Sequence, residues 1–552
     1  MDTTTAFSSV YGSSTSVPWT SESFLWMLIT GFVAAIVLSF SVGANDVANS
    51  FGTTVGSKAI TIRQACILAT IFETSGALLI GAKVGETIRK GIIDVEVYSF
   101  DGGTEILMTG QVSAMFGSAM WQLLATCLRL PVSGTHSIVG ASIGFSLVAV
   151  GAKGVSWKNL GFIVVSWFVS PVLAGFASVV LYYFISKYIL DSNDPLQRGL
   201  KLLPMFYSVT VGLNLFSILY SGAPVLGLDN LPLWGVALVS GGGMLLIAIA
   251  TLFIIVPRVK KKSEELMRSE ASEKKFDESV SSCSSESHEK ASRSSIDFDP
   301  PPAFDTVEAC SRSLSSNKSV DYKHETVVFL KGDTEKAGSS RHGTEKTCMV
   351  QLRTSDHSIN DCGPEDSTSV AEDTPEDDAE KDDPIPVRQL FSSLQVLTAC
   401  FASFAHGGND VSNAIGPLIA LWMIYWSGGV GQVGFTPWYL LLYGGAGISL
   451  GVWTFGRGVM KTIGEDLTKV TASRGFCIEL MTAATVLIAS NIGIPISTTH
   501  CKVGAVVSIG WYGSRAAVDW SVARNIACAW FVTVPVSGLL SAGCMFLLMQ
   551  FL

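Results

Sequence analysis

The chain has 552 residues, of which 48% are hydrophobic and only 15% are charged, and it contains 53 glycines. This composition excludes an ordinary soluble domain and is typical of a polytopic membrane protein. The formal net charge of −9 comes mainly from one polar insert, so it indicates no nucleic-acid partner.

Apolar segments of about 20 residues, long enough to cross a bilayer, fall into two groups. Seven precede the polar insert, at 23–43, 64–83, 105–128, 131–150, 160–186, 204–222 and 232–256. Five follow it, at 390–408, 437–454, 471–492, 495–512 and 521–551, and 411–426 is a further apolar piece that could form a half-helix. The sequence therefore predicts an all-α polytopic membrane protein with about twelve transmembrane helices.

This pattern divides the chain into four regions: 1–22, a membrane half at 23–257, a loop at 258–389, and a second membrane half at 390–552. The loop is rich in Ser, Glu, Asp and Lys without hydrophobic periodicity, which predicts disorder. A basic cluster opens the loop, at Arg258 and Lys260 to Lys262. By the positive-inside rule, we expect the loop in the cytoplasm and both termini outside the cell.

Two motifs recur at one fixed offset. Asn45-Asp46 returns at Asn409-Asp410, and PVSGTH from Pro131 returns as PISTTH from Pro495, each 364 residues later. The predicted crossings place the two copies in opposite orientations, so the halves are expected to be inverted repeats, which in transporters build a site from broken helices near the membrane midplane. We expect the helix breaks at four positions: Gly43, Gly407, Pro131 and Pro495.

The PVSGTH and PISTTH elements have the character of an anion site. Proline interrupts the helix, and the helix that restarts after it directs free N–H groups and its positive dipole end at an anion. Hydroxyl donors add no charge, which suits an oxyanion that must be released; ordinary helix capping by Ser and Thr is the alternative. The candidate oxyanion ligands are Ser133, Gly134, Thr135, Ser497, Thr498 and Thr499.

The two NDV elements offer carboxylate and amide oxygens, which suit a hard cation such as sodium. A bound cation would also make room electrostatically for an anionic substrate. The alternatives are a capping or packing role for the aspartates and hydrogen bonds between helices for the asparagines. The candidate sodium ligands are Asn45, Asp46, Asn49, Asn409, Asp410 and Asn413.

Five further ionisable residues lie in or beside apolar helices and are candidates for an essential role in transport: Glu73, Glu479, His136, His406 and His500. Intramembrane carboxylates are functional candidates by default, with a buried, hydrogen-bonded Glu as the alternative. A histidine bonded to its neighbours competes with pH sensing or substrate contact. The sequence has no HExxH or paired Cys/His pattern and no visible nucleophile and base, so we expect neither an enzyme nor a cofactor other than sodium.

The motifs also carry a family resemblance. GANDVANSFGTTVGSK with QACILATIFE, PVSGTHSIVGASIGFSLVA, FAHGGNDVSNAIGPL and ASNIGIPISTTHCKVG together resemble the inorganic phosphate transporter (PiT) family, specifically the animal-type, type III sodium-dependent phosphate cotransporters. The resemblance covers nearly all of both membrane halves. It implies sodium-driven symport of inorganic phosphate across the plasma membrane by alternating access, an inverted-repeat fold and a homodimer in the lipid bilayer.

The resemblance also assigns residues. Positions regarded as functional in that family match Asp46, Asp410, His406, Glu73, Glu479, Ser133 and Ser497, and the sodium and phosphate pocket matches Asn45, Asn49, Asn409, Asn413, Thr135, Thr498 and Thr499. Among the candidate oxyanion ligands the two motifs differ at one position, where the first half has Gly134 and the second half has Thr498. The two half-sites should therefore contact phosphate differently. Two rival functions remain: a proton-coupled or sulfate-type oxyanion transporter, and a phosphate-sensing membrane receptor.

Overall fold

The computed structural model describes residues 24–222, 226–228, 231–269, 272, 383–432, 434 and 436–552. The predicted N-terminal region 1–22 and most of the predicted loop 258–389 lie outside these residues. The two ends of that loop are helical, because the helix that begins at Leu233 continues to Ser269 and another helix begins at Ile385.

The described chain is mostly α-helical with short 3₁₀ and π-helical turns, and it has two isolated β-bridges and no longer strand within it. The first half contains α2 (Leu25–Gly56), α3 (Ile62–Lys90), α4 (Gly103–Cys127), α5 (Gly134–Ala149), α6 (Trp157–Ile185), α7 (Pro195–Ser221) and α8 (Leu233–Ala250). The second half contains α11 (Ile385–Ser427), α12 (Trp438–Lys461), α13 (Ala472–Ile492), α14 (Thr498–Gly513) and α15 (Trp520–Leu548). Eight helices in the described residues are long and apolar enough to cross a membrane. The predicted all-α membrane fold is confirmed, while the number of crossings stays a prediction.

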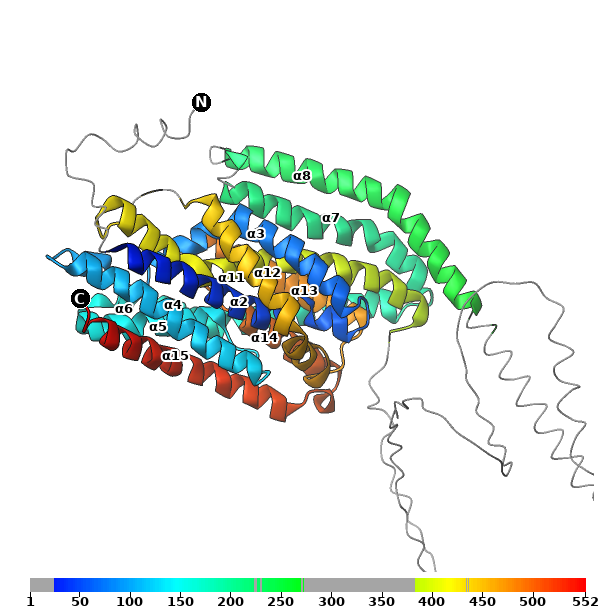
Figure 1. Ribbon diagram of the computed structural model, residues 1–552. Helices are drawn as coiled ribbons and strands as arrows, with labels where there is room; N and C mark the ends of the chain where they lie inside the picture. Colours follow the sequence, from blue (N-terminus) through cyan, green and yellow to red (C-terminus); the bar gives the residue numbers. More distant parts are fainter. Residues whose placement is uncertain are drawn as a thin grey trace, which may run out of the picture. The chain divides into compact units, whose positions relative to one another are not determined.

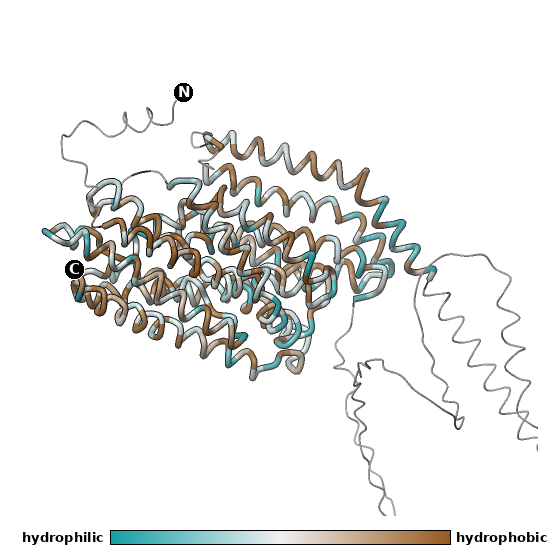
Figure 2. The backbone as a smooth tube through the Cα atoms, viewed as in Figure 1, coloured by the Kyte–Doolittle hydropathy of each residue, from teal (hydrophilic) through white to brown (hydrophobic). Residues whose placement is uncertain are grey.

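Burial separates inner helices from outer ones. In an apolar stretch of 18 residues, 72% of the residues are buried in α11 and in α13, whereas only 11% are buried in the helix that begins with α8 and only 22% in α15. Within the helical unit, α8 and α15 lie on opposite sides (Figure 1). Figure 2 shows that α8 is mostly hydrophobic and that its helical continuation to Ser269 ends in a hydrophilic stretch. Exposed apolar side chains on such outer helices are suited to contact with lipid.

The predicted helix breaks at Gly43 and Gly407 are wrong. Both glycines lie inside continuous helices, α2 and α11, and 411–426 is therefore the second part of α11 and no separate half-helix. The glycines serve packing instead: a Cβ atom on Gly43 would overlap the backbone of Ile448 in α12, and one on Gly407 would overlap the backbone of Glu73 in α3. Glycine here lets two helix backbones approach each other closely.

The predicted breaks around Pro131 and Pro495 are present. The helix α4 ends at Cys127 and α5 begins at Gly134, while α13 ends at Ile492 and α14 begins at Thr498. A residue in the left-handed region follows each of the two ending helices, Arg129 with φ of 58° and Gly493 with φ of 79°. Such residues commonly end helices, and the prolines then hold the linkers extended.

One connection is anchored to α5 from outside the membrane-spanning segments. Tyr98, in the 3₁₀ turn Val95–Tyr98 between α3 and α4, is fully buried and donates a hydrogen bond of 3.1 Å to the Ser146 hydroxyl. Burial raises the pKa of Tyr98 to about 12, so its hydroxyl remains a donor at neutral pH. This bond fixes the end of α5 that lies away from Ser133.

Candidate functional site

The helices α5 and α14 begin in the same way. The Ser133 hydroxyl accepts a hydrogen bond from the N–H of His136 at 3.2 Å, and the Ser497 hydroxyl accepts one from the N–H of His500 at 3.1 Å. Both serines are therefore helix caps, as the capping alternative predicted for them. The following residues still begin a turn whose N–H groups lack intrahelical acceptors, so the helix starts keep their capacity for an anion.

The two helix starts are tied to each other across the halves of the chain. Thr135 donates to the carbonyl oxygen of Ile496 at 2.9 Å, and Thr499 donates to that of Val132 at 3.1 Å. Each threonine thus holds the linker that precedes the other half's helix. Thr499 lies 364 residues after Thr135, and Ile496 lies 364 residues after Val132, so the two bonds are equivalent in the two halves. The repeated motifs therefore meet in one place.

The carboxylates of Asp46 and Asp410 lie at this meeting point. Asp46 accepts from Asn49 at 3.1 Å and from Thr499 at 3.3 Å. Asp410 accepts from Asn409 at 3.2 Å and from Thr498 at 3.3 Å. A Cβ atom on Gly134 would lie 3.1 Å from Oδ2 of Asp46, so that carboxylate reaches the start of α5.

Both carboxylates are almost completely buried, with exposed fractions of 3% and 4%. Asp46, Asp410 and Glu73 are near enough to repel one another electrostatically. A buried carboxylate needs a compensating positive charge or a proton. A cation bound between these carboxylates would supply the compensating positive charge.

Three amide oxygens in the cluster have no hydrogen-bond donor among the described residues: Oδ1 of Asn49, of Asn409 and of Asn413. A buried acceptor without a partner is costly and calls for an explanation. Sodium coordinates oxygen atoms of this kind, and carboxylates beside them would supply the neutralising charge. The donor set therefore fits sodium.

Asn45 differs from the other three asparagines. Its amide oxygen accepts from the N–H of Val132 at 3.0 Å, and its amide nitrogen donates to the carbonyl oxygen of Leu130 at 2.9 Å and to Thr126 at 3.2 Å. The side chain thereby holds the linker between α4 and α5. In this conformation Asn45 positions the start of α5. Its amide oxygen is occupied, whereas the amide oxygen of Asn409 has no donor among the described residues.

Glu73 belongs to a small polar cluster around α2. Its Oε1 accepts from Ser50 at 3.2 Å and from Ser403 at 3.4 Å, and the Ser50 hydroxyl lies 3.1 Å from Nδ1 of His406. The second nitrogen of His406 has no partner among the described residues. The structure therefore joins two of the predicted residues, Glu73 and His406, through Ser50.

Glu479 belongs to a different cluster, which includes a residue that the sequence analysis missed. Its carboxylate accepts from Thr53 at 2.7 Å, from Thr398 at 3.1 Å and also from Thr54, and Nζ of Lys502 lies 4.0 Å away. Glu479 and Lys502 are both fully buried. A lysine within an apolar run is the signal that identifies Lys502, since intramembrane charges are rare and paired.

The histidines of the two helix starts contact each other. The rings of His136 and His500 have centroids 4.3 Å apart, with Trp167 stacked on the first and Trp530 packed on the second, each at 3.7 Å. Nδ1 of His136 lies 2.8 Å from the Ser133 hydroxyl, and Nδ1 of His500 lies 3.1 Å from the carbonyl oxygen of Trp167. Within the described ranges no three His, Cys, Asp or Glu side chains are grouped to hold a metal ion. These contacts favour a packing role for both rings.

A family model described as the phosphate transporter family matches residues 42–541. The chain belongs to this family. The solved structure of a protein titled "The sodium-dependent phosphate transporter" aligns with 95% of this chain and all of its own, with a TM-score of 0.68 and 31% identity.

Members of the phosphate transporter family from vertebrates are more similar still. Sodium-dependent phosphate transporter 1-A of Danio rerio is 46% identical, and the match covers 94% of each chain. Sodium-dependent phosphate transporter 2 of Homo sapiens is 44% identical over 96% of this chain and 98% of its own. Sodium-dependent phosphate transporter 2 of Xenopus tropicalis is also 44% identical, over 95% and 98%.

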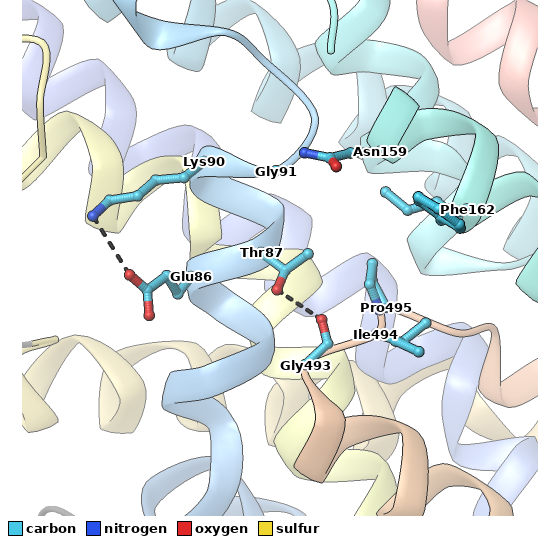
Figure 3. A pocket seen from close by; sticks show the side chains of 10 residues that line it. Glu86, Thr87, Lys90, Gly91, Asn159, Phe162, Gly493, Ile494 and Pro495 are labelled. Carbon is cyan, nitrogen blue, oxygen red and sulfur yellow. Dashed lines mark hydrogen bonds and ion pairs between the residues drawn. The ribbon is translucent and has the colours of Figure 1, made fainter. Parts of the chain in front are cut away.

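This phosphate transporter family member also has a pocket of about 360 Å³ beside the linker that precedes α14. Figure 3 shows the Thr87 hydroxyl directed at the carbonyl oxygen of Gly493, with Asn159 and Phe162 on the opposite wall. None of the predicted site residues lines this pocket. It ends at Pro495, two residues before the Ser497 cap, and so adjoins one of the two helix starts.

Proposed function

We propose that the chain is a sodium-coupled symporter that carries inorganic phosphate across the plasma membrane by alternating access. The relatives named above carry sodium dependence and phosphate transport in their names. The observation that carries the proposal is the approach of the Asp46 carboxylate to the start of α5, in a cluster with three buried amide oxygens that have no donor in the described part of the chain.

The two ion sites would share one pocket. Asp46, Asp410 and the amide oxygens of Asn49, Asn409 and Asn413 would hold sodium. Phosphate would bind at the N–H groups of the two helix starts and at the hydroxyls of Thr135, Thr498 and Thr499. Without sodium, the two carboxylates would repel phosphate, so cation binding must come first or together with it.

The hydroxyls and amides that would bind ions are bonded to one another in this conformation. Asn49 donates to Thr499, and Asn413 donates to Thr135, both at 2.9 Å. Ion binding would replace such bonds, and their loss would free the two helix starts to move relative to each other. We propose that this exchange links binding to alternating access between inverted halves.

The proposed arrangement in the membrane follows the distribution of basic residues. The loop after α8 would lie in the cytoplasm, both termini would lie outside, and two copies would form a homodimer in the bilayer. Cysteine labelling of introduced residues at either end of α2 in intact cells would report the orientation. Labelling from the outside near Gly56 instead of near Leu25 would reverse it.

Transport by the purified chain in proteoliposomes tests the proposed function. Radiolabelled phosphate should accumulate under an inward sodium gradient and should not accumulate when potassium replaces sodium. A proton gradient alone should give no uptake, and excess sulfate should not compete. Uptake driven by protons, competition by sulfate, or phosphate binding without uptake would each replace the proposal with one of its rivals.

A further inference from the structure

A second candidate site lies between α6 and α7, and none of the residues of the ion pocket lines it. It is a groove of about 530 Å³ formed by the last turns of α6, the π-helical turn Ser186–Leu190 and the first turns of α7. Its lining consists of Leu181, Phe184, Ile185, Tyr188, Ile189, Arg198, Lys201, Leu202, Met205 and Phe206.

The walls of the groove are apolar and open to the side of the helical unit. Phe184, Tyr188 and Met205 have exposed fractions of 49%, 53% and 50%. These side chains belong to two helices that are long and apolar enough to cross a membrane. The groove therefore faces the hydrocarbon of the bilayer, where an acyl chain is the available apolar occupant.

One end of the groove is basic. Arg198 and Lys201 line it, and Lys187 belongs to the π-helical turn beside it. Arg198 uses one N–H group on the carbonyl oxygen of Tyr188 at 3.4 Å, which leaves most of its five donors for another acceptor. Guanidinium and ammonium groups in this arrangement suit a phosphate group.

The acidic residues of the same connection are engaged within it. Asp194 caps α7 by accepting from the N–H of Gln197 at 3.0 Å, and Asp191 accepts from Ser186 at 3.4 Å. Neither acid lines the groove. Arg198 and Lys201 are therefore the only charged side chains among the residues that line the groove, which favours an anion at that end.

The length of the groove matches one leaflet. Arg198 and Phe206 are eight residues apart on α7, a rise of about 12 Å along a helix, and the hydrocarbon of one leaflet is about 15 Å deep. A head group at Arg198 would thus place an acyl chain along the groove as far as Phe206. The positive-inside rule puts this basic end on the cytoplasmic side, and the cytoplasmic leaflet holds the anionic lipids.

We propose that this groove binds one anionic phospholipid of the cytoplasmic leaflet. Its phosphate group lies between Arg198 and Lys201, and one acyl chain lies against Leu202, Met205 and Phe184. The site is separate from the ion pocket and does not depend on the transported ion.

Lipid binding to the full chain in detergent micelles, counted by native mass spectrometry, tests the proposal with phosphatidylserine and phosphatidylcholine as probes. The wild-type chain should prefer phosphatidylserine. Arg198→Gln with Lys201→Gln should weaken that binding about thirtyfold, since each of the two basic residues contributes on the order of 1 kcal/mol near a charged lipid and a factor of ten corresponds to about 1.4 kcal/mol. The matched control is Arg457→Gln with Lys461→Gln, which removes two exposed basic residues from α12 and should change nothing.

A second variant tests the apolar part. Met205→Trp places a larger side chain in the groove and should reduce phosphatidylserine binding while the thermal unfolding midpoint stays that of the wild type. Equal binding of the two lipids by the wild type, or full phosphatidylserine binding by the double glutamine variant, would overturn the proposal. Undiminished binding by a folded Met205→Trp variant would remove the groove as the acyl-chain site.

Discussion

The amide nitrogen of Asn49 in α2 lies 2.9 Å from the hydroxyl oxygen of Thr499 in α14, and Asn413 in α11 lies the same distance from Thr135 in α5. Asn413 lies 364 residues after Asn49, and Thr499 lies 364 residues after Thr135, so the two pairs are equivalent in the two halves. Each half of the chain therefore supplies an asparagine to the other half's helix start, and one pocket is built from both motifs.

The role of Asn45 can be separated from that of Asn413. Asn45→Ala removes the bonds to Val132 and Leu130 and leaves a buried N–H group unpaired, which should cost about 1–3 kcal/mol of stability. Asn413→Ala removes one bond to Thr135 and a free oxygen, so it should mainly raise the sodium concentration for half-maximal uptake. Thermal unfolding and sodium titrations on both purified variants check this. Equal unfolding midpoints with equal loss of sodium affinity would contradict the distinction.

Glycines at the helix contacts should not tolerate a methyl group. Gly43→Ala and Gly407→Ala place a Cβ atom on the backbone of the facing helix, and overpacking of this kind costs about 1–3 kcal/mol or more. Both variants should give less folded protein in detergent and a lower unfolding midpoint. The control is Gly242→Ala in α8, where no atom lies within 4 Å of the added carbon; a loss of the same size there would show that the effect is not packing.

The buried pair of Glu479 and Lys502 should behave as a unit. Lys502→Met leaves the carboxylate without its positive partner, and breaking a buried pair costs about 3–5 kcal/mol. Adding Glu479→Gln should restore much of that stability, because the amide oxygen can keep accepting from Thr53 and Thr54 while the amide NH2 group can donate to the Thr398 hydroxyl. Unfolding midpoints of the single and double variants, with the exposed Lys461→Met as control, measure the coupling. A double variant less stable than Lys502→Met would show that the two charges do not compensate each other.

Sodium itself should stabilise the folded chain. A ligand at 100 times its dissociation constant adds about 2.7 kcal/mol of stability, so the unfolding midpoint should rise when sodium replaces potassium at constant ionic strength. Asp46→Asn with Asp410→Asn should abolish the rise. A rise that persists in this double variant would place the sodium site elsewhere.

Much of the fold and of the pocket follows from local patterns. The extended apolar runs predict the helices, and Pro with Ser and Thr predicts the interruptions before α5 and α14. Glycine is ambiguous, since it permits both a helix break and a close backbone contact, and at Gly43 and Gly407 the second holds. The partners of Glu479 come from α2, α11 and α14, and no sequence period connects them.

The two NDV motifs show the same limit of prediction from local sequence patterns. Asn45 and Asn409 each open an Asn-Asp-Val triplet, but the amide oxygen of Asn45 is bonded to the linker after α4, whereas the amide oxygen of Asn409 has no donor among the described residues. Such a difference arises from the tertiary position of each linker. Lys502 could have been noticed as a lone charge in an apolar run, although its pairing with Glu479 could not.

Phosphate uptake into proteoliposomes by the wild type and by the Asp46→Asn, Asp410→Asn double variant, under the same inward sodium gradient, tests the central claim most directly. The wild type should accumulate phosphate only with sodium. The double variant, shown to be folded by its unfolding midpoint, should lose at least 90% of that uptake, a tenfold effect that corresponds to about 1.4 kcal/mol. Sodium-dependent uptake at the wild-type rate by the double variant would contradict the proposed site.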